Sequence, residues 1–335
     1  MKKFTKLSIL LIIFCMSILG TTVAFAEDKP IELHIGCDSP EDTVTYIFLE
    51  KFAALLEAKT NGKVVVRRYS NAKLGNDVEL IEGVQNGNVT FAVQNTAPQV
   101  NFIPELAVFD LPMAFPNIEI ARKVMSGKLL EELRKAHAKK NITLLAYADQ
   151  GFRQMSTNKA VSKLEDLKGQ KIRTMSNPNH VAFWKAVGAN PTPMTFGEVY
   201  ISLQQKAIDG QENPLEAIIA AKLHEQQDYI VLTNHFVHAL SLIGSPAIIE
   251  TLPKEVQDAI PLAATEAKEY AYKMTDERAA GRVKIIEDSG TKILAISDEL
   301  YNQMKEAGKP VYESIEKKIG KDLVDLIQKE VEAAK

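Results

Sequence analysis

Two arginines of this chain stand in segments that otherwise have the composition of buried strands. Arg153 follows Gly151-Phe152 at the start of one segment, and Arg173 lies inside the apolar run Ile172 to Met175. A guanidinium in such a place needs an anionic partner, and its planar fork can hold a carboxylate through two parallel, charge-assisted hydrogen bonds. The partner is either the carboxylate of a bound molecule or an acid of the protein itself. Composition alone favours neither source, and the candidate protein acids are Asp149, Asp209 and Glu212.

Catalytic signatures are scarce in the sequence. It has no GxSxG nucleophile elbow, no HExxH zinc helix, no Walker A loop and no GxGxxG fingerprint, which weakens an enzymatic interpretation. His235 and His238 could bind a metal from one face of a helix, but they flank an apolar, strand-like segment, which favours packing or surface roles. We predict no catalysis, no metal and no cofactor. The alternative that stays open is a secreted hydrolase or lyase acting on an acidic substrate, with Asp38 or Glu212 as general base.

The first part of the chain alternates strands and helices, which predicts a βαβαβ unit and a parallel sheet covered by helices. The hydrophobic spacing sets the limits of these elements. Strands are expected at Ile31–Ile35, Lys63–Tyr69, Val89–Gln94 and Ile142–Ala148, and helices from Val44 to the Asn61-Gly62 break, from Leu74-Gly75 to Val84, and twice between Ile118 and Lys140.

A second series of elements begins at Gly151 and predicts a second lobe of similar build. Strands are expected at Phe152–Thr157, at Lys171–Thr174 and near Thr192, with a helix from Asn179 to Val187. This part contains two capping-box motifs, each of which predicts the start of a helix. Ser162-x-x-Glu165 precedes a short helix, and Thr195-x-x-Glu198 opens a helix that runs to about Gln205.

The segment from Lys254 to about Asp288 is rich in Ala, Glu and Lys, which predicts an unusually long helix that could lie across both lobes. Gly281 within it is either a tolerated weak point or a bend. Two more helices are expected, from Asp298 to Lys318 and from Lys321 to Ala334. We predict that lobe I comprises residues 27–150 with about 239–278, and that lobe II comprises residues 151–238 with about 279–335.

The first 26 residues have the order of a cleaved secretory signal. Three lysines precede an uncharged apolar run from Leu7 to Leu19, and small residues follow as far as Ala26. That run is shorter than the roughly 20 apolar residues that cross a bilayer. We predict cleavage near Ala26 and a periplasmic or other extracytoplasmic location. A lipid anchor on Cys15 is the alternative, which the bulky Phe14 disfavours.

Charge and cysteine content disfavour two classes of function. Without the three lysines of the signal, the formal net charge changes from −3 to −6, and no basic stripe is present. Nucleic acid is therefore not expected as a partner. Cys37 would be the single cysteine left, which disfavours a disulfide, a redox motif or a structural zinc site. A lone thiol of this kind is more often a small buried apolar residue.

Three motifs of the second lobe carry a family resemblance. They are Leu167-Lys168-Gly169-Gln170-Lys171-Ile172-Arg173-Thr174, Gly188-Ala189-Asn190-Pro191-Thr192-Pro193-Met194 and Asp209-Gly210-Gln211-Glu212-Asn213-Pro214. Together with Leu74-Gly75 and Phe109-Asp110-Leu111-Pro112, they resemble the receptors of tripartite ATP-independent periplasmic (TRAP) transporters of the DctP type. The resemblance covers essentially the whole predicted mature chain.

The resemblance implies a two-lobed α/β fold of the type II-like periplasmic binding proteins. Each lobe is then a mainly parallel sheet flanked by helices, strands cross between the lobes, and a long helix spans both. Ligand binds in the interlobe cleft and the lobes close by a hinge. The implied partners are a small carboxylate ligand and the membrane permease subunits. The receptor does not itself span the membrane, and a monomer is the default expectation.

The resemblance also implies roles for individual residues. Arg173 occupies the place of the arginine that binds the ligand carboxylate. Arg153 matches a second arginine that assists, Asn213 an asparagine that braces the carboxylate, and Phe196 an aromatic residue that packs against the ligand. The positions that match contacts to the remote end of the ligand are Asp38, Asn95 and Asp77, for which capping or turn roles stay open as the alternative.

The remote-end residues also bear on the ligand. The branch that binds sialic acid carries a glutamate and an arginine where this chain has Asn95 and Pro98, so sialic acid is disfavoured. Asp38 and Asn95 suit hydroxyl groups, which tilts the expectation toward a sugar acid such as a uronate over a C4-dicarboxylate. We therefore predict a receptor that binds a small organic acid and delivers it unaltered. A binding protein that serves a sensor kinase stays open as an alternative.

Overall fold

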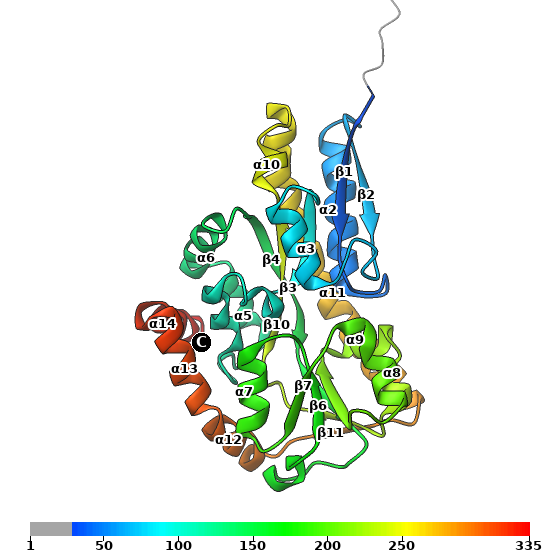
Figure 1. The fold of residues 1–335 in the computed structure, drawn as a ribbon, viewed down its shortest axis with the longest axis vertical. Coiled ribbons are helices and arrows are strands. Elements are labelled where there is room, and N and C mark those ends of the chain that lie inside the picture. The colour runs from blue at the N-terminus through cyan, green and yellow to red at the C-terminus, as the bar shows by residue number, and fades with distance from the viewer. Residues whose placement is uncertain (1–28) are drawn as a thin grey trace, which may run out of the picture. The chain divides into compact units, whose positions relative to one another are not determined.

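Residues 29–335 are described by the computed structural model, so the predicted signal segment of residues 1–26 lies outside the described residues. Within the described part, no helix is both long and apolar enough to cross a membrane. Two β-sheets, one of five strands and one of six, organise residues Ile31–Lys335 (Figure 1). Each sheet is the centre of one lobe, and the predicted two-lobed α/β fold is confirmed.

The five-stranded sheet has the order β2-β1-β3-β10-β4. Its strands are β1 (Ile31–Gly36), β2 (Val64–Tyr69), β3 (Phe91–Asn95), β4 (Thr143–Phe152) and β10 (Val237–Gly244). The predicted parallel βαβαβ unit is present, since β1 pairs in parallel with both β2 and β3. The later strand β10 is antiparallel to β3 and to β4. Strands β3 and β10 are buried along their whole length, as expected for the middle of a sheet covered on both faces.

Among the described residues, the four longest helices of the first lobe lie where the hydrophobic spacing of the sequence predicts them, and three shorter ones were not predicted. They are α2 (Val44–Lys59), α3 (Asp77–Gln85), the short α4 (Thr96–Gln99), the 3-10 helix η1 (Pro104–Asp110), α5 (Ile118–Met125), α6 (Lys128–Ala138) and α10 (Pro246–Ile249). Thr43 caps α2 by accepting a hydrogen bond from the Tyr46 N–H. The apolar face of α2, including Phe48 and Phe52, is fully buried in the core. Cys37 is also buried there, as the sequence suggested.

The six-stranded sheet has the order β11-β9-β5-β8-β6-β7. Its strands are β5 (Gln154–Thr157), β6 (Lys171–Thr174), β7 (Asn190–Pro193), β8 (Gly210–Asn213), β9 (Tyr229–Leu232) and β11 (Lys292–Ala295). Strand β6 is parallel to β7 and β8, whereas β5 is antiparallel to β8 and β9. The helices of this lobe are η2 (Leu164–Leu167), α7 (Pro178–Ala186), η3 (Phe196–Glu198), α8 (Val199–Gln204), α9 (Leu215–Ala220) and η4 (Leu223–Gln226).

Strands β4 and β10 and the long helix α11 (Lys254–Asp288) are among the segments that connect the two lobes. Strand β4 leads from the first sheet into β5 of the second, and β10 returns antiparallel beside β4, with Val237 opposite Phe152. Helix α11 packs on α2 and β4 of the first lobe and on α9 and β11 of the second (Figure 1). The long helix predicted from composition is therefore confirmed, and it lies across both lobes.

Of the two predicted capping boxes, the first is wrong and the second is present. Glu165 does not close the box that starts at Ser162, because the 3-10 turn begins one residue later. Asp166 accepts hydrogen bonds from the N–H (3.0 Å) and the hydroxyl (3.1 Å) of Ser162 instead. The second box is confirmed, since Glu198 accepts from the Thr195 N–H at 3.1 Å and from its hydroxyl at 2.6 Å.

The predicted helix from Asp298 to Lys318 is two helices, α12 (Asp298–Ala307) and α13 (Lys309–Ile319). They meet at Gly308, where an added Cβ would lie 2.9 Å from the Pro112 side chain. The proline that follows in the first turn of α13 has no N–H to continue the earlier helix. The last helix, α14 (Lys321–Ala334), is confirmed and packs on α5 and α6. The exact limits of the two lobes stay a prediction.

Gly281 offers a test of helix α11. It is exposed, and a Cβ added there would meet no atom within 4 Å. We expect Gly281→Ala to raise the free energy of unfolding by about 0.5–1 kcal/mol, because alanine loses less backbone entropy in a helix. Urea unfolding followed by circular dichroism would measure this, with Ala280→Gly as the matched control of opposite sign. A less stable Gly281→Ala protein would show that the glycine is needed for a bend.

Candidate functional site

Two adjoining cavities lie where the lobes face each other. Five residues line both of them: Asp38, Asp77, Arg173, Met175 and Phe196. Asp38 comes shortly after β1 and Asp77 begins α3 in the first lobe, whereas Arg173 lies in β6 and Phe196 begins η3 in the second. The open volumes are about 30 Å³ and 20 Å³, room for roughly one water molecule each. A larger molecule can therefore enter only if the facing walls move apart.

Arg173 is buried, with 2% of its surface exposed. Its Nε and Nη2 both donate to the carbonyl oxygen of Met194, at 3.1 and 2.7 Å, while Nη1 is buried without a hydrogen-bond partner. Within residues 29–335, no carboxylate oxygen lies within 4.0 Å of this guanidinium. Burial lowers the pKa of Arg173 to about 10, which nearby acids only partly oppose. Arg173 is thus a buried cation that lacks a close protein counter-ion.

Arg153 is in the opposite situation. It lies between β4 and β5, and its Nε forms a short contact with Glu212 Oε2 while Nη2 donates to Glu212 Oε1 at 2.9 Å. Nη2 also lies 3.2 Å from Asn213 Oδ1, and Nη1 lies 2.6 Å from Nδ1 of His238. Both members of the ion pair are at most 1% exposed. Of the two arginines, this is the one that pairs with a protein acid.

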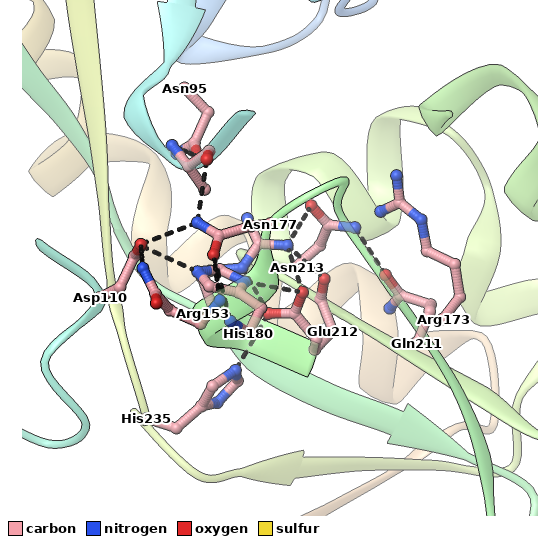
Figure 2. A network of polar contacts seen from close by, with 12 residues as sticks. Asn95, Asp110, Arg153, Arg173, Asn177, His180, Gln211, Glu212, Asn213 and His235 are labelled. Atoms are coloured by element: carbon pink, nitrogen blue, oxygen red, sulfur yellow. Dashed lines mark hydrogen bonds and ion pairs between the residues drawn. The ribbon is translucent and has the colours of Figure 1, made fainter. Parts of the chain in front are cut away.

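Glu212 is the centre of a buried network (Figure 2). His235 Nε2 lies 3.0 Å from its Oε2, and His180 Nδ1 lies 3.6 Å from its Oε1. Burial raises the pKa of Glu212, but the charge of Arg153 and the contacts with both histidines outweigh it and hold the pKa well below its usual range. Glu212 is therefore ionised and engaged on both oxygens.

The network continues to Asp110, the last residue of η1. Its carboxylate accepts from Nδ2 of Asn177 at 2.8 Å and of Asn179 at 2.9 Å, and it lies 3.1 Å from His180 Nε2. Figure 2 shows Asp110 facing Asn177 and His180 at the start of α7. The motif around Asp110 carried part of the family resemblance, but nothing in the sequence assigned the residue to this junction between lobes.

The two aspartates of the cavities form an acidic pair. The Ser39 hydroxyl donates to Asp38 Oδ1 at 2.9 Å, while Asp77 Oδ1 is buried without a partner. Burial raises the pKa of Asp38. Burial, and then the charge of Asp38 and a hydrogen bond with it, raise the pKa of Asp77 well above its usual range. The like charge of the two carboxyl groups therefore disfavours ionisation of both at once.

The structure brings most of the expected site residues together. Asn95 and Asn213 line the second cavity with the five shared residues, whereas Arg153 lies behind it and touches Asn213. The Asn95 side chain is used locally, since Oδ1 accepts from the Ala97 N–H and Nδ2 donates to the Ala239 carbonyl. Sequence reasoning did not single out three further lining residues, Thr45, Gln150 and Met175, and it took His238 for a packing or surface histidine.

Comparison with known proteins shows which family this chain belongs to. A model of the DctP family, described as bacterial extracellular solute-binding protein, family 7, matches residues 35–318. The chain belongs to the DctP family. A solute-binding protein of Verminephrobacter eiseniae in the same comparison is 34% identical over 297 residues, 88% of each chain.

Solved structures related to this DctP-family chain include complexes with two kinds of acid. The sugar acid binding protein DctPAm of Advenella mimigardefordensis, in complex with galactonate, is 31% identical, covers 92% of this chain and 99% of its own, and has a TM-score of 0.89. A TRAP periplasmic solute binding protein of Shewanella oneidensis, with bound succinate, is 27% identical, covers 90% and 99%, and has a TM-score of 0.86. The resemblance to TRAP receptors of the DctP type is therefore confirmed.

Proposed function

We propose that this protein is the extracytoplasmic receptor of a TRAP transporter, which binds a small organic acid between its lobes and delivers it unaltered to the membrane permease subunits. The observation that carries the proposal is Arg173, a buried guanidinium in an interlobe cavity with one nitrogen unpaired. A buried cation without a counter-ion is costly unless a ligand supplies the charge. A ligand carboxylate would supply it.

The hydrogen bonds of Arg173 leave one edge of its guanidinium open. A guanidinium has five N–H donors. The Nε–H and one N–H of Nη2 serve Met194, so both N–H groups of Nη1 and the second of Nη2 stay available. A carboxylate can bind this edge in a bidentate manner without displacing Met194. Phe196, half-buried in the same cavity, offers an apolar surface for the carbon chain.

Arg153 and Asn213 support this arrangement from behind. Asn213 receives a hydrogen bond from Arg153 and donates from Nδ2 to Gln211 Oε1 at 2.6 Å, which holds its amide in one orientation. We propose that Asn213 contacts the ligand and that Arg153 positions it. The proposed remote-end contacts are Asp38, Asp77 and Asn95, with Asn95 limited by its two backbone hydrogen bonds.

Closure of the lobes is supported by an ion cluster outside the cavities. Asp42, which precedes α2, lies 2.6 Å from Arg278 Nη2 and 2.9 Å from Arg282 Nη2, both on α11. The same arginines bind Glu216 of α9 at 2.8 and 3.1 Å. The cluster therefore joins a loop of the first lobe to a helix of the second. Ligand that touches both walls would favour this closed arrangement over an open one.

The same geometry disfavours the catalytic alternative for Glu212. A general base must reach a proton of the substrate, and the two oxygens of Glu212 are engaged by Arg153 and His235. We propose that the ligand leaves unaltered, that no cofactor takes part, and that the receptor acts as a monomer outside the cytoplasm after cleavage near Ala26.

A thermal-shift screen of the purified protein tests the proposal. The panel would contain C4-dicarboxylates, uronates, aldonates and 2-keto acids. We expect at least one acid to raise the melting temperature, because binding to the native state stabilises it by RT ln(1 + [L]/Kd). The hit would be recovered after incubation and analysed by mass spectrometry. Recovery of a converted product, or no shift with any acid after denaturation and refolding to remove bound ligand, would contradict the proposal.

A further inference from the structure

The cavities hold one cation and two acids. Among the described residues that line them, Arg173 is the only arginine or lysine, and Asp38 and Asp77 are the only acids. Arg153, behind the lining, is neutralised by Glu212, and burial next to Arg153 keeps His238 uncharged by lowering its pKa well below the usual range. The lining therefore offers one positive charge to a ligand, and that charge is on Arg173.

The acidic pair is placed to meet the other end of such a ligand. Asp38 and Asp77 belong to the first lobe, across the cavities from the second-lobe Arg173. Asp77 Oδ1 is buried without a hydrogen bond, and Asp38 receives one from Ser39. A buried oxygen without a donor is costly. This end therefore has room for a donor from the ligand, since Asn95 Nδ2 in the same lining donates to the Ala239 carbonyl and no protein group among the described residues donates to Asp77 Oδ1.

Hydroxyl groups fit this end and a carboxylate does not. A hydroxyl donates one hydrogen bond and accepts others, so it can donate to an ionised carboxylate oxygen and can also accept a hydrogen bond from a protonated carboxyl group. A second carboxylate would lie beside the charge of the pair, and the one cation among the described residues that line these cavities, Arg173, already binds the first carboxylate. Like charges in a buried site repel strongly.

We propose that Asp38 and Asp77 select hydroxylated monocarboxylates, such as aldonates, and reject dicarboxylates. This inference rests on the proposed function, because it takes the ligand carboxylate to be bound by Arg173. It goes further by naming the class of acid and the two side chains that choose it.

Matched pairs of ligands test the inference by isothermal titration calorimetry. D-galactonate is compared with galactarate, and D-gluconate with D-glucarate. In each pair the terminal hydroxymethyl group of the first acid is a carboxylate in the second. Succinate is included as a short dicarboxylate. We expect at least one aldonate to bind about 100-fold or more tightly than its dicarboxylate partner and than succinate, since like-charge contact in a buried site is strongly unfavourable.

The double variant Asp38→Asn, Asp77→Asn identifies the residues responsible. It keeps the shape of both side chains and removes the negative charge. We expect the preferred aldonate to bind at least about 10-fold more weakly, through loss of charge-assisted hydrogen bonds, while the preference over its dicarboxylate partner falls below about 10-fold. The control is Asp258→Asn, an exposed acid on α11 far from the lining. The melting temperature of each ligand-free variant reports whether it is folded.

Four outcomes would overturn the inference, and they separate it from the proposed function. Tight binding of succinate or an aldarate that is lost in Arg173→Ala would leave the receptor role intact and remove the selection. A folded double variant that keeps the full preference for the monocarboxylate would remove the two aspartates as its source. Absence of binding by every acid of this panel and of the thermal-shift screen would overturn both proposals together, whereas binding of a uronate or 2-keto acid alone would overturn only the inference.

Discussion

Arg173→Ala is expected to weaken binding of the preferred acid by about 100-fold or more, which corresponds to roughly 3 kcal/mol. The physical reason is that the closed cleft would then hold a carboxylate without its cation, and truncating one partner of a buried charge pair costs about 2–5 kcal/mol. Calorimetry measures the effect directly. The fold should survive, because Arg173 bonds to one carbonyl and makes no ion pair within residues 29–335.

Two further variants sharpen this prediction. Arg173→Lys is expected to lie between the wild-type protein and Arg173→Ala, because an ammonium is a point charge and cannot bind both carboxylate oxygens as a fork does. Arg67→Ala serves as the control, since Arg67 is exposed and pairs with Glu32 at the surface. Unchanged affinity in a folded Arg173→Ala protein would show that the carboxylate is bound elsewhere. Equal binding by Arg173→Lys would indicate a looser ionic contact.

Glu212→Gln is expected to lower the free energy of unfolding by about 3–5 kcal/mol, because removing one member of a buried ion pair leaves the other charge uncompensated. Arg153 is the residue left behind, and it is 1% exposed. His235 would also lose its charged acceptor. Urea unfolding followed by circular dichroism measures the change.

The control for Glu212→Gln is Glu313→Gln on the exposed face of α13, for which a change within about 0.5 kcal/mol is expected. Adding Arg153→Met to Glu212→Gln should recover part of the lost stability, because the double change removes both buried charges. A loss below about 1 kcal/mol in Glu212→Gln, or no recovery in the double variant, would mean that the ion pair contributes little to the fold.

Structural features that depend on residues close together in the chain could be predicted from the sequence. Helix α11 begins and ends where composition placed it, at Lys254 and Asp288, and the Thr195 box closes as its spacing requires. Both depend on groups only a few residues apart, such as the i and i+3 partners of a capping box. The break at Gly308 also has a local signal, Pro310, which the sequence prediction did not use. The close approach of Pro112, almost two hundred residues away in the chain, is visible only in the fold.

The two arginines show the limit of sequence reasoning most clearly. Both lie in apolar segments, and from the sequence alone either arginine could pair with a ligand carboxylate or with an acid of the protein. Arg153 meets Glu212 because antiparallel pairing of β5 with β8 places Gln154 opposite Asn213. Strand β6 instead places Arg173 beside Thr192 of β7, and its guanidinium reaches the Met194 carbonyl.

The sequence by itself determined the order of strands and helices, the long helix and the family, because these depend on periodicity, composition and motifs within short stretches of chain. Only the tertiary structure decided which buried arginine is neutralised and which acids face the other. Those pairings depend on strand register and on the approach of two lobes, and the groups involved are far apart in sequence. Electrostatic energy follows distance in space, and for Arg153, Arg173, Asp38 and Asp77 the fold sets that distance.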